Sequence, residues 1–573
     1  MWYANRFVVL LAMTCAGGAP AADELPLVVD GQSDYAIVIP ADAIAAERRA
    51  ADDLADYLRR ISGAELPILR AGAQLPQRAI VLGPRPTRSG GEAFAIRTDG
   101  QRLFITGDRP RGVLYGTQAF LESLGVRWFA PAVTHVPRRP TIRLGPIDRV
   151  ETPAFEYREI YFTEALDRNW APRLRVNGSH VPADESTGGK IVYAQFVHTF
   201  DTLVPPALFD SHPEYFPLID GKRAGGYVQR CLTHPDVLRL SVAAVDKLFS
   251  EHPSASITSV SQNDTARWCQ CDACNAVAAR YGGKQSGLYL WFVNQLAEQI
   301  EARPPGKMTD TLAYQFTEPA PAGITPRHNV RVRVCPIAVC LGHPYDGDAY
   351  PQSKAFLDAL RDWGRLTDQL YVWHYGINFA HYQQPFPDFG QFPSSIRLYR
   401  QSGVKGIFFQ GCYPPAAGGS FAELRSYVVA RLLWDPSVNE RGLIQEWMTG
   451  VYGPAAEPML QWFDLLHRTV AETRDQHFNC FAPAPAWYLT DDVIAAGDRL
   501  FDEAQRLAVD PGVADRVERA RLGLRYAKVM RDKPVDDEFR SFMSDVRRHG
   551  IGQLREGRDI DWWEQKYEKD HAR

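Results

Sequence analysis

Between residues 23 and 147, short apolar runs alternate with one strongly amphipathic stretch. From about residue 42 to 61 the apolar side chains recur at helical spacing, and Ser62-Gly63 follows as a stop signal. The apolar runs are predicted as strands, and Asp99-Gly100 is predicted as the turn of a hairpin. The strands cover residues 27–29, 35–39, 79–83 and 94–106, and a second helix is predicted over 111–124. This pattern predicts a small α/β domain over residues 23–147.

From residue 152 to 438 the pattern changes to repeats of a strand followed by a helix. Helical stretches such as 288–302 and 355–366 separate short apolar runs. Repeats of this kind favour an α/β fold with a (β/α)8 TIM-type barrel. Helical periodicity then predicts a helical C-terminal region over 439–573. The eighth barrel strand has no clear run, and the seven that do are 155–162, 191–198, 256–264, 312–316, 330–335, 370–375 and 406–410.

The predicted strand at residues 312–316 runs directly into Glu318 and a Pro-rich loop. In a parallel barrel the carboxyl ends of the strands carry the active site. Glu318 is therefore the first candidate for a catalytic acid, because a buried glutamate keeps its proton more readily. The alternative is a loop glutamate that faces solvent.

The other predicted strands also end in polar or aromatic side chains. A polar pocket with aromatic walls suits a saccharide, whose cleavage needs a proton donor and a second, charge-stabilising group. That second group is Asp264 or Glu159, or else the substrate's own 2-acetamido group oriented by Asp264, Asn263 or Tyr375. Structural roles are the alternative, such as an Arg158–Glu159 ion pair. The candidate sugar-binding residues are Arg158, Glu159, His198, Asn263, His343, Asp346, Trp373, His374, Tyr375 and Gln410.

Composition narrows the class of protein. A chain of 573 residues is too long for one hydrophobic core, so two or three domains are expected. Its net charge of -4 offers no basic surface, so nucleic acid is not an expected partner. The 13 Trp and 24 Tyr residues suit sugars, which have apolar faces and hydrogen-bonding edges, although core packing also uses such side chains.

The N-terminus has the pattern of a secretory signal peptide over residues 1–22. Arg6 precedes an apolar run over 7–13, and small residues with Ala19-Pro-Ala21 follow. We therefore expect export to the periplasm or the extracellular space. Later apolar runs fall short of the roughly 18 residues that a spanning helix needs, so no membrane span is expected.

Eight cysteines remain after the predicted cleavage, and Cys269-Gln-Cys271-Asp-Ala-Cys274 is a dense cluster. Joined by Cys231 or a histidine, these thiols have the chemistry to hold zinc. A second paired knuckle is missing, and an oxidising compartment permits disulfides. A disulfide or a small cross-linked loop is the favoured interpretation, and neither a metal site nor a cofactor is predicted.

Several N-terminal segments resemble the domain that precedes the catalytic barrel in α-glucuronidases and β-hexosaminidases. They are residues 47–63, Ile105-Thr-Gly-Asp-Arg-Pro-Arg-Gly112, 114–116 and 121–131. The resemblance implies that this domain is not catalytic and that a (β/α)8 barrel follows it.

A second resemblance runs over most of the mature chain. His212-Pro-Glu-Tyr-Phe216, Cys231-Leu-Thr-His-Pro235 and Val260-Ser-Gln-Asn-Asp264 resemble the bacterial domain-of-unknown-function family 4838. That family is similar to glycoside hydrolase family 163 and includes gut-bacterial endo-β-N-acetylglucosaminidases that cut within complex N-glycans. Thr317 precedes Glu318, so the Asp-Glu pair of β-hexosaminidases is not matched and the nucleophile stays open.

These observations predict a secreted glycoside hydrolase that acts on an oligosaccharide or glycoprotein glycan at a β-linked N-acetylglucosamine. Glu318 is the expected general acid/base, and Asp264 the stabiliser or nucleophile. Two alternatives remain. An exo-acting α-glucuronidase-like enzyme would pair Arg158 with a uronate carboxylate. A non-catalytic glycan-binding protein on a decayed barrel would bind without turnover.

Overall fold

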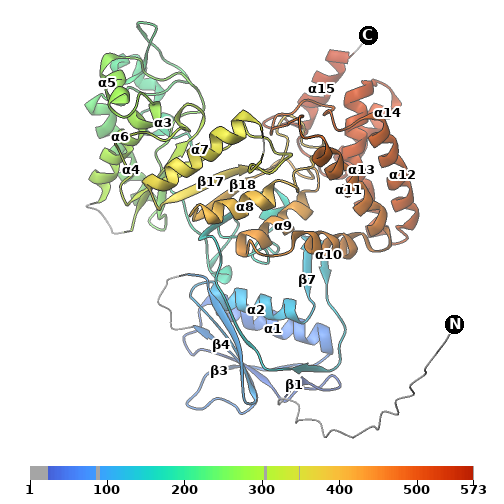
Figure 1. The fold of residues 1–573 in the computed structure, drawn as a ribbon. Coiled ribbons are helices and arrows are strands. Elements are labelled where there is room, and N and C mark those ends of the chain that lie inside the picture. Colours follow the sequence, from blue (N-terminus) through green and yellow to red (C-terminus); the bar gives the residue numbers. More distant parts are fainter. Residues whose placement is uncertain (1–23, 85–90, 302–305, 348, 572–573) are drawn as a thin grey trace, which may run out of the picture. The chain divides into compact units, whose positions relative to one another are not determined.

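The computed structural model describes residues 24–84, 91–301, 306–347 and 349–571 (Figure 1). The predicted signal peptide lies outside these residues. The chain forms two compact units. The first runs to Leu124 and includes Val136–Glu151, and the second comprises Gly125–His135 with the chain from Thr152 onward.

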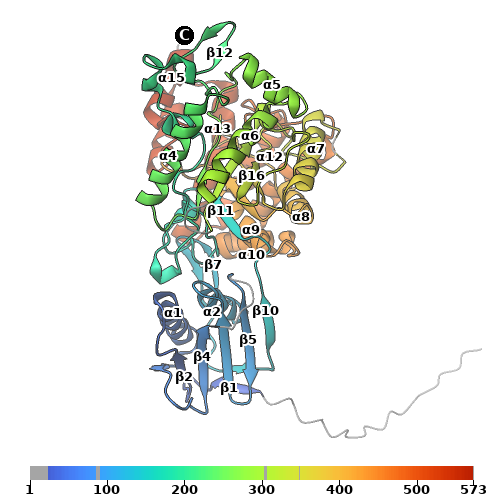
Figure 2. The same cartoon turned by 90° about the vertical axis from the view of Figure 1, so that its left-hand side faces the viewer.

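The first unit is a six-stranded sheet in the order β10-β5-β6-β4-β2-β3, with α1 and α2 packed together on it (Figure 2). The predicted amphipathic helix is confirmed as α1, which ends at Gly63 in the left-handed conformation with φ 86°. The predicted hairpin is confirmed as the antiparallel pair β5 and β6, with Gly100 at φ 57° in its turn. The elements of this unit are β1 (Leu25–Val28), β2 (Ala36–Ile39), α1 (Ala45–Ser62), β3 (Ile68–Arg70), β4 (Ala79–Pro84), β5 (Phe94–Asp99), β6 (Arg102–Gly107), α2 (Gly112–Ser123), β9 (Ile142–Leu144) and β10 (Asp148–Glu151).

The second unit is built on a parallel sheet in the order β11-β18-β17-β16-β15-β14. The first strand of this sheet in the sequence pairs with the last, so the sheet curls as it does in a barrel. Helices follow most of its strands, as the strand–helix pattern predicts (Figure 1), whereas β15 is followed only by a short 3-10 helix over Gln315–Thr317. The strands are β11 (Tyr157–Tyr161), β14 (Ile257–Ser259), β15 (Met308–Ala313), β16 (Val330–Val334), β17 (Leu370–Tyr375) and β18 (Gly406–Gln410), and the main helices are α4 (Pro235–Glu251), α5 (Asp272–Arg280), α6 (Gln285–Glu301), α7 (Pro351–Leu366), α8 (Phe392–Gln401) and α9 (Ala422–Trp434).

The predicted eight-stranded closure is seen only in part among the described residues. The expected strand at 191–198 forms a single parallel bridge, between Tyr193 and Ile257, rather than a continuous ladder. The described part of the unit is therefore a curled half-barrel. Short pieces complete the rest: β7 (Arg127–Ala130), β8 (Val133–His135), β12 (Leu218–Ile219), β13 (Lys222–Arg223) and α3 (Phe200–Leu203).

The inside of the curled sheet is aromatic and holds one buried ion pair. Tyr157, Tyr193 and Tyr371 form part of one buried cluster with Ile257 and Phe408. Nη2 of Arg333 lies 3.3 Å from Oδ2 of Asp310, and both side chains are 0% exposed. The Tyr193 hydroxyl donates to the same carboxylate oxygen at 3.0 Å. This pair fills the half-barrel beneath the carboxyl ends of the strands.

The predicted helical C-terminal region is confirmed. Its last helices share a core of their own, in which Trp563 stacks on Tyr567 with ring centroids 5.2 Å apart. None of the helices in the described part of the chain is long and apolar enough to cross a membrane. The helices are α10 (Glu440–Tyr452), α11 (Ala456–Glu472), α12 (Asp491–Leu507), α13 (Pro511–Asp532), α14 (Asp537–Arg548) and α15 (Ile560–His571).

Candidate active site

A cavity of about 450 Å³ opens at the carboxyl ends of the parallel strands. Its walls come from the ends of β11, β15, β17 and β18, from the loops that follow all six strands of the sheet, and from two segments of the C-terminal region. Proteins with a parallel sheet bind their ligands at this edge, because the backbone pairing stops there and the loops diverge. The lining residues are Tyr161, His180, Phe196, His198, Asp264, Leu312, Tyr314, Cys335, Ile337, Trp373, Tyr375, Phe379, Phe408, Gln410, Tyr413, Phe481 and Glu556.

Aromatic rings form most of the cavity wall. Tyr161 stacks on Tyr413 with centroids 5.0 Å apart and planes 11° apart. Trp373 meets Phe408 edge to face at 4.6 Å, and its Nε1–H donates to Oε1 of Gln410 at 2.8 Å. The rings are held in place by one another and by this hydrogen bond. They offer flat apolar faces beside a few fixed polar groups, which is the usual make-up of a ligand pocket.

A buried carboxylate orients the histidine on one wall. Oε1 of Glu159 lies 2.9 Å from Nδ1 of His180 and accepts the His180 main-chain N–H at 2.6 Å. The Tyr157 hydroxyl donates to the other oxygen of the carboxylate. Burial alone raises the pKa of Glu159, but the hydrogen bonds from His180 and Tyr157 outweigh it and the pKa lies below its ordinary value. Glu159 thus stays charged and acts through His180, which lines the cavity.

Asp264 stands at the opening of the cavity. Its main-chain N–H donates to the Tyr227 hydroxyl at 2.9 Å. The amide of Gln315 bridges its side chain to a neighbour, because Nε2 donates to the Tyr314 hydroxyl at 2.9 Å and lies 3.4 Å from Oδ1 of Asp264. Burial, and after it the charge of Asp264, raises the pKa of Tyr314, so this phenol keeps its proton. Gln315 thus connects the Asp264 carboxylate with the Tyr314 hydroxyl.

Glu556 supplies a second carboxylate, from the segment between α14 and α15. Its Oε1 accepts from the Tyr413 hydroxyl at 3.1 Å and lies 3.5 Å from Nε2 of Gln410. Its main-chain N–H donates to the Phe379 carbonyl at 2.9 Å, which ties this segment to the loop after β17. Burial raises the pKa of Glu556, the Tyr413 bond lowers it, and the charge of Asp264 raises it further. The cavity therefore holds two carboxylates that sense each other.

Sequence reasoning does not find Glu556. Glu556 lies far from the barrel strands along the chain, in a region whose main sequence pattern is helical periodicity. One signal was available: three glycines, at 550, 552 and 557, interrupt an otherwise helical region. Such an interruption indicates a loop with a defined path, and loops carry function more often than the elements they join.

Glu318 lies four residues after the lining residue Tyr314 but is not itself among the described residues that line the cavity. Its main-chain carbonyl accepts from Nε1 of Trp363 on α7 at 2.8 Å. The half-buried carboxyl has no hydrogen bond or ion pair with the described residues, and burial raises its pKa to about 7. That pKa suits a proton donor. The role predicted for Glu318 stays a prediction.

Four predicted residues line the cavity beside Asp264, namely His198, Trp373, Tyr375 and Gln410. His198 adopts φ 58°, and its Nδ1 lies 2.8 Å from the Gln262 carbonyl. Because the ladder alternates, Trp373 and Tyr375 face the inside of the sheet and the residue between them does not.

The structure does not bring the remaining predicted residues to the cavity. Arg158 is 1% exposed and donates to the carbonyls of Arg175 and Phe155. His374 is fully buried, bonds the Tyr399 hydroxyl at 3.0 Å, and has its pKa lowered to about 3 by burial. Arg158 and His374 are each adjacent to an inward-facing residue on their strand. Because side chains alternate between the two faces, both point toward the helices outside the curled sheet.

Asn263, His343 and Asp346 also lie elsewhere. Asn263 is 1% exposed and donates through Nδ2 to Asp201 and to the Val228 carbonyl. His343 groups with Cys340 and His477, and Asp346 is an exposed loop residue. Asn263 thus supports the loop that carries Asp264 rather than facing the cavity itself.

Solved structures with a similar fold are glycoside hydrolases. One is a family GH115 4-O-methyl-α-glucuronidase with specificity for decorated arabinogalactans, at 13% identity and a TM-score of 0.56 over 90% of this chain and 76% of that one. Another is a GH138 enzyme targeting pectin rhamnogalacturonan II, at 12% identity and a TM-score of 0.51 over 90% of this chain and 72% of that one. At these identities the likeness concerns the fold.

The chain belongs to the family described as "Domain of unknown function (DUF4838)", whose model matches residues 128–464. The model for "Glycosyl hydrolase family 20, domain 2" matches residues 26–137. Both matches confirm the coarser part of the resemblances noted from the sequence. A search of curated proteins finds no match.

Proposed function

We propose that this protein is an endo-acting glycoside hydrolase, which cleaves complex glycans at a β-linked N-acetylglucosamine within the glycan chain. One observation carries the proposal. A cavity at the carboxyl edge of a curled parallel sheet combines aromatic walls with two carboxylates, Asp264 and Glu556. Glycosidic cleavage needs such a pair, and aromatic faces suit pyranose rings. The glycoside hydrolase folds of the solved relatives support the same class.

In this proposal Glu556 donates the proton to the leaving oxygen. Its raised pKa keeps a larger share of the carboxyl protonated near neutral pH, as a general acid requires. Asp264, bridged by Gln315 to Tyr314, stabilises the positive charge that develops on the sugar or on its 2-acetamido group. His180, held by Glu159, donates a hydrogen bond to the bound sugar or accepts one from it.

A uronate-releasing enzyme is the second candidate, because one solved relative is described as an α-glucuronidase. An anionic sugar calls for an arginine or lysine partner. The described lining residues include neither, and Arg158, expected from the sequence to take this role, is buried away from the cavity. The charge of Asp264 also repels the carboxylate of a uronate. The charges of the site therefore favour a neutral sugar over a uronate.

The test is release of glycans from a complex N-glycoprotein by the purified mature protein, followed by mass spectrometry. Glu556→Gln, Asp264→Asn and Glu318→Gln are assayed beside the wild type, with the exposed Glu503→Gln as the control. Wild type and control are expected to release glycans one N-acetylglucosamine short, and Glu556→Gln to lose about 10²-fold or more in rate.

Each other outcome leads to a different conclusion. Loss of rate in Glu318→Gln with full activity in Glu556→Gln would move the proton donor to Glu318. Release of uronates from plant oligosaccharides, with no action on N-glycans, would favour the second candidate. If the wild type and all the variants bound glycans without cleaving them, the protein would be a glycan-binding protein. Export through the predicted signal peptide at residues 1–22 is part of the proposal.

A further inference from the structure

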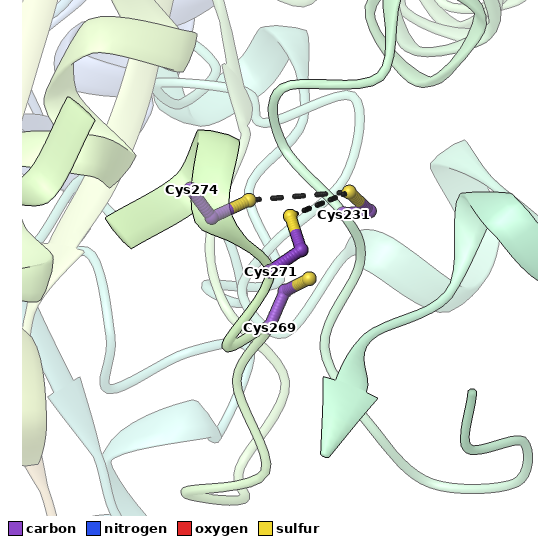
Figure 3. A group of neighbouring side chains, drawn as sticks. All are labelled: Cys231, Cys269, Cys271 and Cys274. Carbon is purple, nitrogen blue, oxygen red and sulfur yellow. Dashed lines mark hydrogen bonds between the residues drawn. The ribbon is translucent and has the colours of Figure 1, made fainter. Parts of the chain in front are cut away.

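Four cysteine side chains converge in the second unit (Figure 3), and none of them is among the described residues that line the cavity. Cys231 lies in the turn before α4. Cys269 and Cys271 lie in the loop before α5, and Cys274 lies in the first turn of that helix. All four Sγ atoms are within 4.8 Å of one another. Three of the side chains are buried and Cys271 is partly exposed.

The sulfur–sulfur distances match a tetrahedral metal site. Sγ of Cys231 lies 3.7 Å from Sγ of Cys271 and 3.9 Å from Sγ of Cys274. A tetrahedron of thiolates about 2.3 Å from a zinc ion has its sulfurs about 3.8 Å apart. A disulfide instead requires about 2.05 Å, and all four cysteines are free thiols in the structure.

We propose that these four cysteines bind one structural Zn²⁺ ion. Four thiolates complete the coordination of zinc and leave no open position, which is the arrangement of a structural rather than a catalytic site. The sequence favoured a disulfide because a second paired knuckle is missing and an oxidising compartment permits disulfides. The fourth cysteine, Cys231, stands 40 residues before Cys271 and joins the other three only in the folded protein.

Donors around the sulfurs suit a charged thiolate cluster. The main-chain N–H of Leu218 donates to Sγ of Cys269 at 3.3 Å, and Nη1 of Arg223 lies 3.9 Å from the same atom. The Thr233 hydroxyl lies 3.2 Å from Sγ of Cys274. Hydrogen bonds of this kind orient the ligands of a metal and offset the negative charge that four thiolates carry around a divalent ion.

The metal would anchor the loop that carries Asp264. Asn263 and Gln229 exchange two hydrogen bonds, at 3.1 and 2.8 Å. The Tyr227 hydroxyl accepts the Asp264 N–H. These contacts join the stretch that leads into Cys231 to the stretch that leads into Cys269. A zinc ion between the two cysteines closes the same pair of segments at their other end, which restricts the motion of Asp264.

The first measurement is the metal content of the full mature protein, purified without added metal, by mass spectrometry of the elements. One zinc per chain is expected, and X-ray absorption should give four sulfurs at about 2.3 Å. Cys274→Ser is expected to lose zinc, whereas Cys412→Ala, which removes another buried cysteine, retains it. Absorption on the wild type decides the matter if Cys274→Ser fails to fold.

Two results would overturn the proposal. One is a metal-free wild type in which non-reducing peptide mapping finds a disulfide among the four cysteines. The other is iron in place of zinc with four sulfur ligands, which would overturn the identity of the ion. None of these readouts uses a glycan, so they stand apart from the test of the proposed enzymatic activity.

Discussion

Nδ1 of His180 lies 2.9 Å from Oε1 of Glu159, a carboxylate that is 0% exposed. The ring is also held by Tyr161, whose centroid is 4.5 Å away. With Nδ1 engaged, Nε2 is the ring nitrogen left for a ligand. The cavity thus gains one imidazole of defined orientation, although the carboxylate that fixes it is not itself a lining residue.

Replacing this histidine should destabilise the fold through its buried partner. His180→Phe keeps an aromatic ring beside Tyr161 but removes the ring nitrogen that satisfies Glu159, while the main-chain N–H and the Tyr157 hydroxyl remain. We expect a loss of about 1–3 kcal/mol in the free energy of unfolding, measured by urea denaturation. Adding Glu159→Gln to His180→Phe should restore most of it, because no buried charge then remains. Simple additivity of the two changes would contradict this account.

Replacing Asp264 and replacing Tyr413 should shift the pH profile of activity in opposite directions. Protonated Glu556 is the active form in our proposal, so activity falls as pH rises through its pKa. The charge of Asp264 raises that pKa and the Tyr413 hydrogen bond lowers it. Asp264→Asn should therefore move the alkaline limb of residual activity to lower pH, and Tyr413→Phe should move it to higher pH. The profile is measured as the rate of glycan release from the N-glycoprotein, and shifts in the same direction for both variants would refute the coupling.

Glu318 predicts a pH dependence of stability. Burial raises its pKa from 4.5 to about 7, so the folded state holds more protons than the unfolded state between those values. Stability should accordingly fall as pH rises from 4.5 to 7, by about 2 kcal/mol for this partly exposed group. Glu318→Gln should flatten this part of the curve in denaturation measured at several pH values. An unchanged slope would show that the carboxyl titrates normally.

The ion pair inside the half-barrel predicts a large loss on removal of one partner. Arg333→Met leaves the buried Asp310 carboxylate uncompensated, and we expect about 3–5 kcal/mol of destabilisation. Arg361→Met serves as the control, since the Arg361–Asp358 pair on α7 is about half exposed and worth less than about 1 kcal/mol. Equal effects of the two variants in urea unfolding would argue against a distinct role for the buried pair.

Local features of the chain are predictable from the sequence because they depend on near neighbours. Apolar spacing and Gly63 determine α1, and Asp99-Gly100 determines the β5–β6 hairpin. The strand–helix repeats likewise indicate the curled parallel sheet, since each repeat is a local unit. Aromatic residues at the ends of strands indicate where a pocket lies, and Trp373 and Tyr375 line the cavity found at that edge.

Only the tertiary structure determines which polar side chains lie close to one another. His374 sits between two cavity residues yet faces outward, because alternation along a strand separates neighbours by face. Glu556 reaches the cavity, and Cys231 reaches the cysteine cluster, from distant parts of the chain. Periodicity reports only on residues within a few positions of each other. The long-range packing that joins these side chains is set by burial over the whole unit, so the sequence determined the scaffold and the folded chain determined the site.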